Sequence, residues 1–460
     1  MTKLRSGDLI AVLRENPRVG SALLCAKLGG IDKSTLVRGL KALGDSVVSC
    51  GGSRRKRYAL RRPVRGNETP LPLYRIDEHG RGQQIGLLQS TYPHGTALSF
   101  QGDFAWPLPE DMRDGWFEGL PYPLYDMRPQ GFLGRNFAKR YALDLNVSEN
   151  PQEWSDDDVL HVCSIMGHDL PGNLILGDVA YRRFLEHTSR ALSRFLSEEQ
   201  IATAYPQLAV SALAQGEVGS TAAGEFPKFT CSRLLAGEKV DVIVKFSGAD
   251  ESAAVRRWSD LLVCEHLALE VMQNVLQVAA AQSRIYRFAG RTFLEVIRFD
   301  RHGEFGRSAL CTLGSLNAAL LGMAAAPWNK VAARLHSDGY LPQHAIATID
   351  LIRSFGKLIA NTDMHEGNLA FRPGLSVAPV YDMLPMFYAP MRGGEVPGKA
   401  FLPELPLPSE RPIWISAAAA AVHYWERCAS DVRISPAFQA VCGENVKALQ
   451  KLLAQQMPSA

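Results

Sequence analysis

The chain has 460 residues, a net charge of +3 and 46% hydrophobic residues, values that are ordinary for a globular protein of two to four domains. No apolar run is long enough to cross a membrane, and the N-terminus lacks the uninterrupted apolar stretch of a signal peptide, so we expect a cytoplasmic protein without a membrane part. The eight cysteines form no C-x-x-C pair, which argues against structural zinc and predicts free thiols.

Positive charge is concentrated at the N-terminus. Residues 1–62 contain 14 Lys and Arg but 4 Asp and Glu, a net charge of about +10, so the remainder of the chain carries about −7. This asymmetry predicts a polyanionic partner for the N-terminal segment alone.

Three helical patterns open the chain: "GDLIAVLREN", "SALLCAKLGG" and "DKSTLVRGLKALG". In the third pattern Asp32 is a typical N-cap, and Leu36, Leu40 and Leu43 are spaced to form one buried stripe. "VVSCGGSRRKRYAL" then predicts two strands joined by a basic turn. Three helices followed by a hairpin is the order of a winged helix-turn-helix domain, which we place at residues 1–62.

This order predicts a DNA-binding surface on the N-terminal head. The third helix would lie in the major groove, and the basic turn would contact phosphates. Alternatively, the turn is an ordinary solvated surface, or the head binds protein. The expected DNA contacts are Lys33, Ser34, Thr35, Arg38 and Lys41 on the helix and Arg54, Arg55, Lys56 and Arg57 on the turn.

The remaining chain divides into a linker and two larger parts. The prolines, glycine and polar residues of "RRPVRGNETPLPLYRI" predict a linker at residues 63–72. Short strand-like runs and turns follow, so we expect a β-rich lobe at residues 73–300. Longer helical patterns predict a mostly helical lobe at residues 301–460. The expected fold class is therefore α+β.

A loop rich in glycine and small residues, "QGEVGSTAAGEFPKFT", follows the apolar run "PQLAVSA", which reads as a strand, and precedes "FTCSRLL". Gly216, Gly219 and Gly224 would allow backbone N–H groups to approach a phosphate. Ser220, Thr221 and Lys228 could add donors. The loop does not have the G-x-G-x-x-G spacing, and an ordinary hairpin turn would have the same composition.

The apolar strand "KVDVIVKFSG" places Lys245 on the face opposite Val244. A lysine at this place in a kinase binds the α- and β-phosphates of ATP and is oriented by a glutamate of the next helix. Glu265 in "VRRWSDLLVCEHLALEVMQNV" is the expected partner, with Glu270 as a competing candidate. A strand-edge lysine and a surface glutamate would be the structural alternatives.

The segment "NTDMHEGNLAF" carries the strongest chemical signal. Asp363 and Asn368 have the D-x-x-x-x-N spacing of a kinase catalytic loop, in which the Asp accepts the hydroxyl proton and the Asn binds a metal ion. A hairpin at "LAF" and "SVAPVY" would return Asp382 to Asn368, and their oxygens suit Mg²⁺. Singly, these residues also occur as turn and cap formers. Their order favours a kinase-like phosphotransferase.

The segments "NTDMHEGN", "VYDMLP", "EVIRFDR" and "WFEGLPYPLYDMRPQGFLGR" resemble those of HipA-type serine/threonine kinases, the toxin kinases of bacterial toxin–antitoxin systems. With a winged-helix head, the chain resembles the YjjJ (HipH) branch of that family. The two lobes would then be kinase lobes, the first including the family's N-terminal subdomain. The resemblance implies ATP and Mg²⁺ as cofactors.

The resemblance also implies roles for particular residues. Asp363 would be the catalytic base, and Ser220 would be the serine whose autophosphorylation switches the kinase off. Asn368 and Asp382 would bind the metal. The chain departs from the family at Gly367, where relatives carry Lys. The implied ATP contacts are Ser220, Thr221, Ala222, Ala223, Gly224, Lys245, Glu265, Ile297, Arg298, Phe299, His365, Glu366, Gly367, Asn368 and Asp382.

Three functions remain open from the sequence. The first is a growth-inhibitory serine/threonine protein kinase with a DNA-binding head, an unknown protein substrate, an antitoxin as a candidate partner and a homodimer as a candidate assembly. The second is a small-molecule kinase, because "DMHEGNLAF" is also similar to the loop of aminoglycoside and choline kinases. The third is a transcriptional regulator whose weak or inactive kinase domain senses nucleotide.

Overall fold

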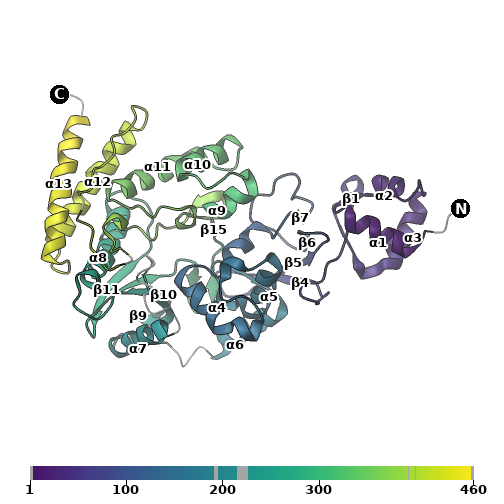
Figure 1. The fold of residues 1–460 in the computed structure, drawn as a ribbon, viewed down its shortest axis with the longest axis horizontal. Helices are drawn as coiled ribbons and strands as arrows, with labels where there is room; N and C mark the ends of the chain where they lie inside the picture. Colours follow the sequence, from purple (N-terminus) through teal and green to yellow (C-terminus); the bar gives the residue numbers. More distant parts are fainter. Residues whose placement is uncertain (1–3, 191–194, 215–225, 392, 399, 457–460) are drawn as a thin grey trace. The chain divides into compact units, whose positions relative to one another are not determined.

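The computed structural model describes residues 4–190, 195–214, 226–391, 393–398 and 400–456 (Figure 1). These residues form two compact units, one of residues 1–128 and 152–189 and the other of residues 129–151 and 190–460. Within the described ranges no helix is both long and apolar enough to span a bilayer. Helices and sheets are mixed in both units, which confirms the α+β class.

The head of the first unit has three helices, α1 (Ser6–Glu15), α2 (Ser21–Lys27) and α3 (Lys33–Leu43). They pack through Leu9, Leu13, Leu24 and Leu36 onto a small antiparallel sheet of order β1-β3-β2. As expected, the Asp32 side chain caps α3 by accepting a hydrogen bond from the Thr35 N–H at 2.9 Å. The strands are β1 (Val19–Gly20), β2 (Val47–Cys50) and β3 (Arg57–Leu60).

The rest of the first unit is an antiparallel sheet of order β7-β6-β5-β4-β8 with two longer helices. The N-terminus of α5 carries a capping box in which Ser155 and Asp158 each accept a hydrogen bond from the other's backbone. The elements are β4 (Leu71–Ile76), β5 (Gly82–Ser90), β6 (Thr96–Phe100), β7 (Trp116–Phe117), β8 (Leu174–Leu176), α5 (Asp156–Met166) and α6 (Asp178–Arg190).

The β2–β3 hairpin packs against the larger sheet of the same unit. Val48, Cys50 and Ala59 form a buried cluster with Ala97 and Trp116. Ion pairs flank this cluster, joining Arg55 to Asp114, Arg62 to Asp157 and Arg65 to Asp158. One face of the hairpin is therefore buried within the first unit.

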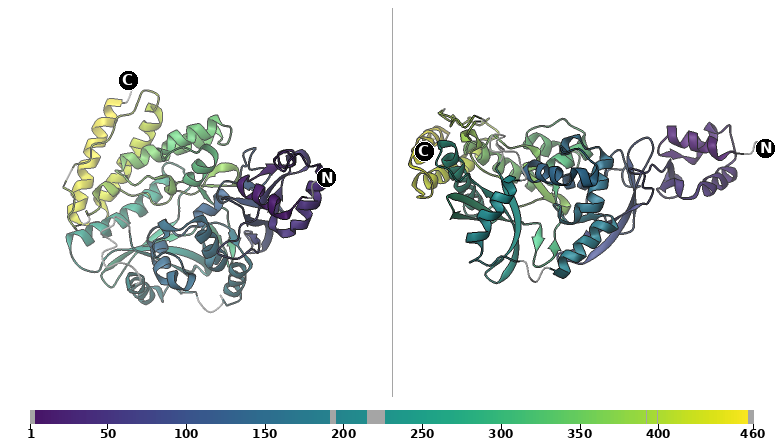
Figure 2. Two further views of the ribbon diagram at one scale, coloured as in Figure 1. Left: turned by 45° about the vertical axis from the view of Figure 1, so that its right-hand side comes forward. Right: turned by 60° about the horizontal axis from the view of Figure 1, so that its bottom comes forward.

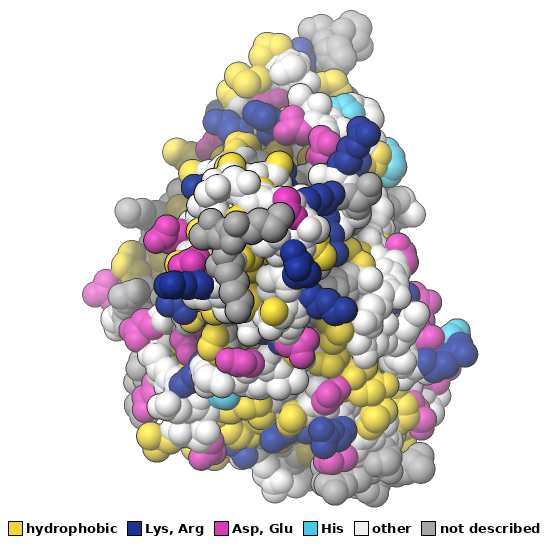
Figure 3. Space-filling view, turned by 90° about the vertical axis from the view of Figure 1, so that its right-hand side faces the viewer, with side chains coloured by type: hydrophobic (Ala, Val, Ile, Leu, Met, Phe, Trp, Pro, Cys, Tyr) yellow, Lys and Arg dark blue, Asp and Glu magenta, His cyan; other side chains and the backbone are white. Residues whose placement is uncertain are grey.

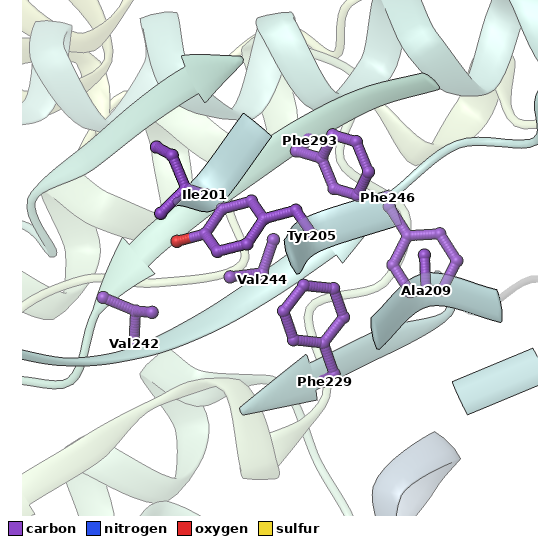
Figure 4. Packing of buried hydrophobic residues seen from close by; sticks show 8 residues of the cluster. All are labelled: Ile201, Tyr205, Ala209, Phe229, Val242, Val244, Phe246 and Phe293. Carbon is purple, nitrogen blue, oxygen red and sulfur yellow. The ribbon is translucent and has the colours of Figure 1, made fainter. Parts of the chain in front are cut away.

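The second unit is built around an antiparallel sheet of order β11-β12-β10-β9. Val242, Val244 and Phe246 of β10 belong to the apolar cluster under helix α7 (Figure 4). Lys245 lies on the opposite face, where it contacts Glu265 of helix α8. The alternation predicted for β10 is thereby confirmed. The elements are β9 (Lys228–Leu235), β10 (Glu238–Phe246), β11 (Ser283–Phe288), β12 (Arg291–Ile297), α7 (Ile201–Ala214) and α8 (Ala253–Asn274).

The expectation of a strand at "PQLAVSA" was wrong, because these residues lie in α7. A short apolar run has no periodicity that separates a buried strand from a buried helix. The alanines and leucine of this run favour helix, and Pro206 is tolerated within the helix. Ile201, Tyr205 and Ala209 are spaced four residues apart and cover the sheet (Figure 4).

A buried polar network fixes α7 to the sheet. Arg233 of β9 and Glu295 of β12 are completely buried and pair at 2.9 Å. The Tyr205 hydroxyl donates to Glu295, and Arg233 also donates to the Tyr286 hydroxyl at 3.1 Å. A buried charge pair needs such additional partners to offset its desolvation.

The helical part of the second unit packs α11, α12 and α13 side by side (Figures 1 and 2). Trp425 of α12 is buried and donates to the Leu358 carbonyl at the end of α11 at 3.1 Å. The remaining elements are α4 (Gly131–Leu145), β13 (Arg301–His302), β14 (Gly306–Arg307), β15 (Cys311–Thr312), α9 (Leu313–Leu316), a π-helix (Asn317–Leu321), α10 (Trp328–Ser337), α11 (Gln343–Leu358), β16 (Ala370–Arg372), β17 (Ser376–Val377), α12 (Arg411–Ser430) and α13 (Pro436–Gln456).

Replacing Tyr205 by Phe tests the network that holds α7. The substitution removes one donor from buried Glu295 while keeping the ring packing, so we expect the free energy of unfolding to fall by about 1–3 kcal/mol. Tyr286→Phe is the matched control and should cost less, because Tyr286 is only half-buried. Denaturant unfolding measures both, and equal losses would contradict the account.

Candidate active site

Lys245 is the central cation of the site and lies on the face of β10 that α8 covers. Its Nζ lies 2.7 Å from both carboxylate oxygens of Glu265. The side chain of Lys245 is 9% exposed and that of Glu265 is 1% exposed, so the pair is almost removed from water. Of the two glutamates considered from the sequence, Glu265 is the partner, while Glu270 pairs with Arg427.

Asp382 completes an ionic triad with this pair. Its Oδ1 contacts the Nζ of Lys245. Asp382 follows the antiparallel β16–β17 pair, in which Phe371 lies opposite Val377, and it has a positive φ of 58°. A non-glycine residue in this left-handed conformation requires support from its surroundings, as is common at functional sites.

The pKa shifts favour the charged forms of Lys245 and Asp382 but not that of Glu265. Burial lowers the pKa of Lys245, but the charges of Asp382 and Glu265 outweigh this effect and raise its pKa. Burial raises the pKa of Glu265, and Lys245 partly offsets that rise. Burial also opposes ionisation of Asp382, yet Lys245 and Lys228 hold its pKa below the ordinary value.

The D-x-x-x-x-N segment forms a closed loop. The Asn368 side-chain N–H donates to the Asp363 carbonyl at 2.8 Å, and the Asp363 N–H donates to Asn361 Oδ1 at 3.0 Å. Asn368 is buried, whereas the Asp363 side chain is exposed. The Tyr381 hydroxyl donates to the Gly367 carbonyl at 2.6 Å and brings the chain before Asp382 to this loop.

Gly367 is explained by the histidine two residues before it. The Gly367 N–H donates to His365 Nδ1 at 3.0 Å. A Cβ at residue 367 would stand 2.9 Å from His365 Cε1, closer than carbon atoms pack. With the imidazole in this position, a glycine fits here without the displacement of His365 that the lysine implied by the family resemblance would require.

The other expected nucleotide contacts differ in whether their polar groups are already used within the protein. The Ile297 and Arg298 N–H groups donate to the Gln282 and Asp241 carbonyls, at 2.8 and 2.9 Å, so these two donors are used within the protein. The Phe299 ring lies 5.8 Å from that of Tyr381. Ser220, Thr221, Ala222, Ala223 and Gly224 lie outside the described residues.

Lys228 follows this undescribed segment and is a further cation of the site. It is directly opposite Lys245 in the β9–β10 pairing, and its charge acts on both Glu265 and Asp382. The sequence singled Lys228 out only as a donor of the small-residue loop. Its cross-strand position next to Lys245 could be found only from the strand register.

The residues present fit a magnesium ion. The Asn368 side-chain N–H₂ group donates to the Asp363 carbonyl, and this bond fixes the orientation of the amide. The amide oxygen of Asn368 is then available as a ligand. Asp382 supplies a carboxylate. Mg²⁺ commonly uses one or two such protein oxygens and completes its shell with water and phosphate. Among the described residues no three His, Cys, Asp or Glu side chains gather into a metal cluster, and this mode of binding needs none.

The expected DNA contacts divide into two groups. Asp32 accepts hydrogen bonds from the Ser34 and Thr35 hydroxyls at 2.5 and 2.8 Å, and Arg38 donates to Thr35 at 3.2 Å, so the first turn of α3 is internally ordered. In the turn, Arg55 pairs with Asp114. Lys33, Ser34, Arg38, Lys41, Arg54, Arg55, Lys56 and Arg57 are exposed. On the face drawn in Figure 3, Lys and Arg side chains are interspersed with Asp, Glu and hydrophobic side chains.

Comparison with known proteins first defines the class. A model of the HipA-like C-terminal domain matches residues 220–451. A chain from the Shewanella oneidensis MR-1 complex of the toxin–antitoxin system HipA and HipB with operator DNA aligns with a TM-score of 0.53 at 14% identity, over 84% of this chain and 97% of that one. The second unit thus has the fold of a HipA-like protein, as the motifs indicated.

The particular family follows from closer matches. A model of the YjjJ-like toxin middle domain matches residues 67–185. Toxin YjjJ of Escherichia coli strain K12 is 33% identical over 451 residues, which are 97% of this chain and 98% of that protein. The chain belongs to the YjjJ-like toxin family.

Two glutamates of α8 offer a matched test of the triad. Glu265→Gln removes the buried partner of Lys245, so we expect the free energy of unfolding to fall by about 1–3 kcal/mol. Glu270→Gln disturbs a half-exposed pair and should cost less than about 1 kcal/mol. Denaturant unfolding of both variants gives the comparison, and a larger loss for Glu270→Gln would count against a structural triad.

Proposed function

We propose that this YjjJ-like toxin is an ATP- and Mg²⁺-dependent serine/threonine protein kinase. The observation that carries the proposal is the triad of Lys245, Glu265 and Asp382 next to the loop of Asp363 and Asn368. These are the groups that kinases use to bind phosphates, hold metal and accept a proton. Their side chains come from a strand, a helix and two loops far apart in the sequence.

The proposed mechanism assigns one task to each group. Lys245, held by Glu265, binds the phosphates of ATP. Asp363 accepts the proton of the substrate hydroxyl as its oxygen bonds to the γ-phosphorus and the bond to the β-phosphate oxygen breaks, leaving ADP. Asn368 and Asp382 would hold Mg²⁺, which supplies positive charge to the transferred phosphoryl group.

A toxin–antitoxin context extends the proposal. We infer that phosphorylation of a cellular protein inhibits growth and that an antitoxin or DNA regulates the kinase. Support comes from the family and from the HipA-like neighbour, which was solved together with HipB and operator DNA. Ser220 remains the proposed site of autophosphorylation. Localisation in the cytoplasm and assembly into a homodimer also remain proposals.

The second candidate function is DNA-dependent regulation through the head. We propose that α3 contacts duplex DNA, since its exposed Arg38 and Lys41 lie on a head with a net charge of about +10. Because the hairpin turn is tied to the larger sheet through Arg55 and Asp114, α3 should contribute more than the turn. A kinase domain that only senses nucleotide would leave this binding intact.

Asp363→Asn tests the proposed chemistry. The amide cannot accept the hydroxyl proton, so phosphate transfer should fall by about 10²–10⁴-fold. Intact mass after incubation with Mg·ATP should show an added phosphate in the wild type and none in Asp363→Asn. Asp338→Asn, at a surface ion pair with Arg334, is the control and should behave as wild type.

Two outcomes would redirect the proposal. Transfer to a small alcohol without any protein substrate would favour a small-molecule kinase. ATP binding without transfer in the wild type would favour the nucleotide-sensing regulator. Mapping the added phosphate to Ser220 would support the autophosphorylation proposal.

Reversing two charges tests the DNA-binding face. Arg38→Glu combined with Lys41→Glu should weaken binding to a fluorescent duplex by tenfold or more and make its salt dependence shallower by about one unit per lost phosphate contact. Lys27→Glu, on exposed α2, reverses a charge on the same head and should have a much smaller effect. Equal losses in both variants would place the contact elsewhere.

A further inference from the structure

Glu366 lies between Asp363 and Asn368 in the D-x-x-x-x-N loop, and its carboxylate is bonded to residues outside that loop. Its Oε1 accepts hydrogen bonds from the Ala326 N–H at 2.9 Å and from the Asn317 Nδ2 at 3.0 Å. Its Oε2 is 3.2 Å from the same Asn317 nitrogen. The sequence placed Glu366 among the nucleotide contacts, but these donors occupy its carboxylate.

The neighbouring residue strengthens this attachment. The indole N–H of Trp328 donates to the His365 carbonyl at 2.9 Å, and Trp328 is buried. Two consecutive residues of the D-x-x-x-x-N loop are therefore fastened to the segment of residues 317–328. This segment is distant in sequence and contains none of the groups assigned to the chemistry.

The backbone around Asn317 is unusual and adds independent support. Asn317 begins the π-helix, an irregularity that proteins often retain at functional positions. It is 2% exposed, and its Oδ1 is buried without a hydrogen-bond partner among the described residues. A buried unsatisfied oxygen is costly. The N–H₂ group of the same amide donates to Glu366, and these bonds offset part of that cost.

We infer that Glu366 is a positioning residue that braces the catalytic loop against Asn317 and Ala326, and not a nucleotide ligand. The brace acts through the backbone on Asp363 and Asn368, which belong to the same hydrogen-bonded loop. The inference rests on the proposed kinase function for its catalytic consequence. The brace itself is a property of the fold and can be measured without activity.

The donor and acceptor pattern allows a rescue experiment. Glu366→Ala removes both acceptors. Asn317→Asp alone places two carboxylates in contact and breaks the brace by repulsion. In the double variant Asn317→Asp with Glu366→Gln, the glutamine oxygen accepts from the Ala326 N–H, and the glutamine N–H₂ group donates to the carboxylate introduced at residue 317. The bond from Ala326 is kept, and one bond to residue 317 forms again with donor and acceptor exchanged and the charge relocated.

Hydrogen exchange of residues 361–372 in the whole protein is the primary readout. The single variants should exchange about tenfold faster in this segment, and the double variant should return to within about threefold of wild type. Thr362→Ala, at an exposed residue of the same loop, should change little. Unchanged exchange in Glu366→Ala, or failure of the double variant to recover, would overturn the brace.

Steady-state kinetics separates positioning from nucleotide binding. Glu366→Ala should lower kcat by up to about 10²-fold, because small displacements of reacting groups have effects of this size, with a KM for ATP within about threefold of wild type. A large rise in KM with normal exchange would make Glu366 a nucleotide ligand instead. Absence of transfer in the wild type would refute the proposed function, while the exchange result would still decide on the brace.

Discussion

The ion pair between Lys245 and Glu265, extended by Asp382, is the interaction on which the candidate site depends. It joins a strand, a helix and the segment after the β16–β17 hairpin, so the charges can form this triad only when all three are in place. Without the lysine, buried Glu265 would be an unpaired charge, which is strongly destabilising, and half-buried Asp382 would lose its ion-pair partner. A single lysine thus links the folding of the second unit to the charges that would face ATP.

Two sets of polar contacts elsewhere in the second unit support the elements that carry this triad and the neighbouring loop. On the far face, Tyr205 and the Arg233–Glu295 pair hold α7 on the sheet that carries Lys245. At the other end, Glu366 holds the loop of Asp363 and Asn368 against residues 317–328. Both supports use buried or half-buried polar groups whose partners are distant in sequence. The HipA-like neighbour has the same fold at 14% identity, so this fold does not depend on one particular set of packing residues.

Much of the site could be predicted from local pattern. Strand alternation placed Lys245 on the correct face, and motif spacing indicated Glu265, although only tertiary packing distinguished it from Glu270. Besides the cross-strand position of Lys228, two features could not be predicted. The apolar run at residues 206–212 has no periodicity that separates strand from helix, and it forms part of α7. The direction of the Glu366 side chain depends on donors some 40 or more residues earlier in the chain, which spacing within the loop does not reveal.

The most direct test of the central claim is the affinity for ATP with and without Mg²⁺, measured by titration calorimetry on the wild type and on Asp382→Asn. If the triad and Asn368 form a nucleotide and metal site, Mg²⁺ will strengthen ATP binding to the wild type. Asp382→Asn will lose most of that Mg²⁺ dependence while remaining folded. Equal Mg²⁺ dependence in both proteins, or no ATP binding by the wild type, would contradict the account.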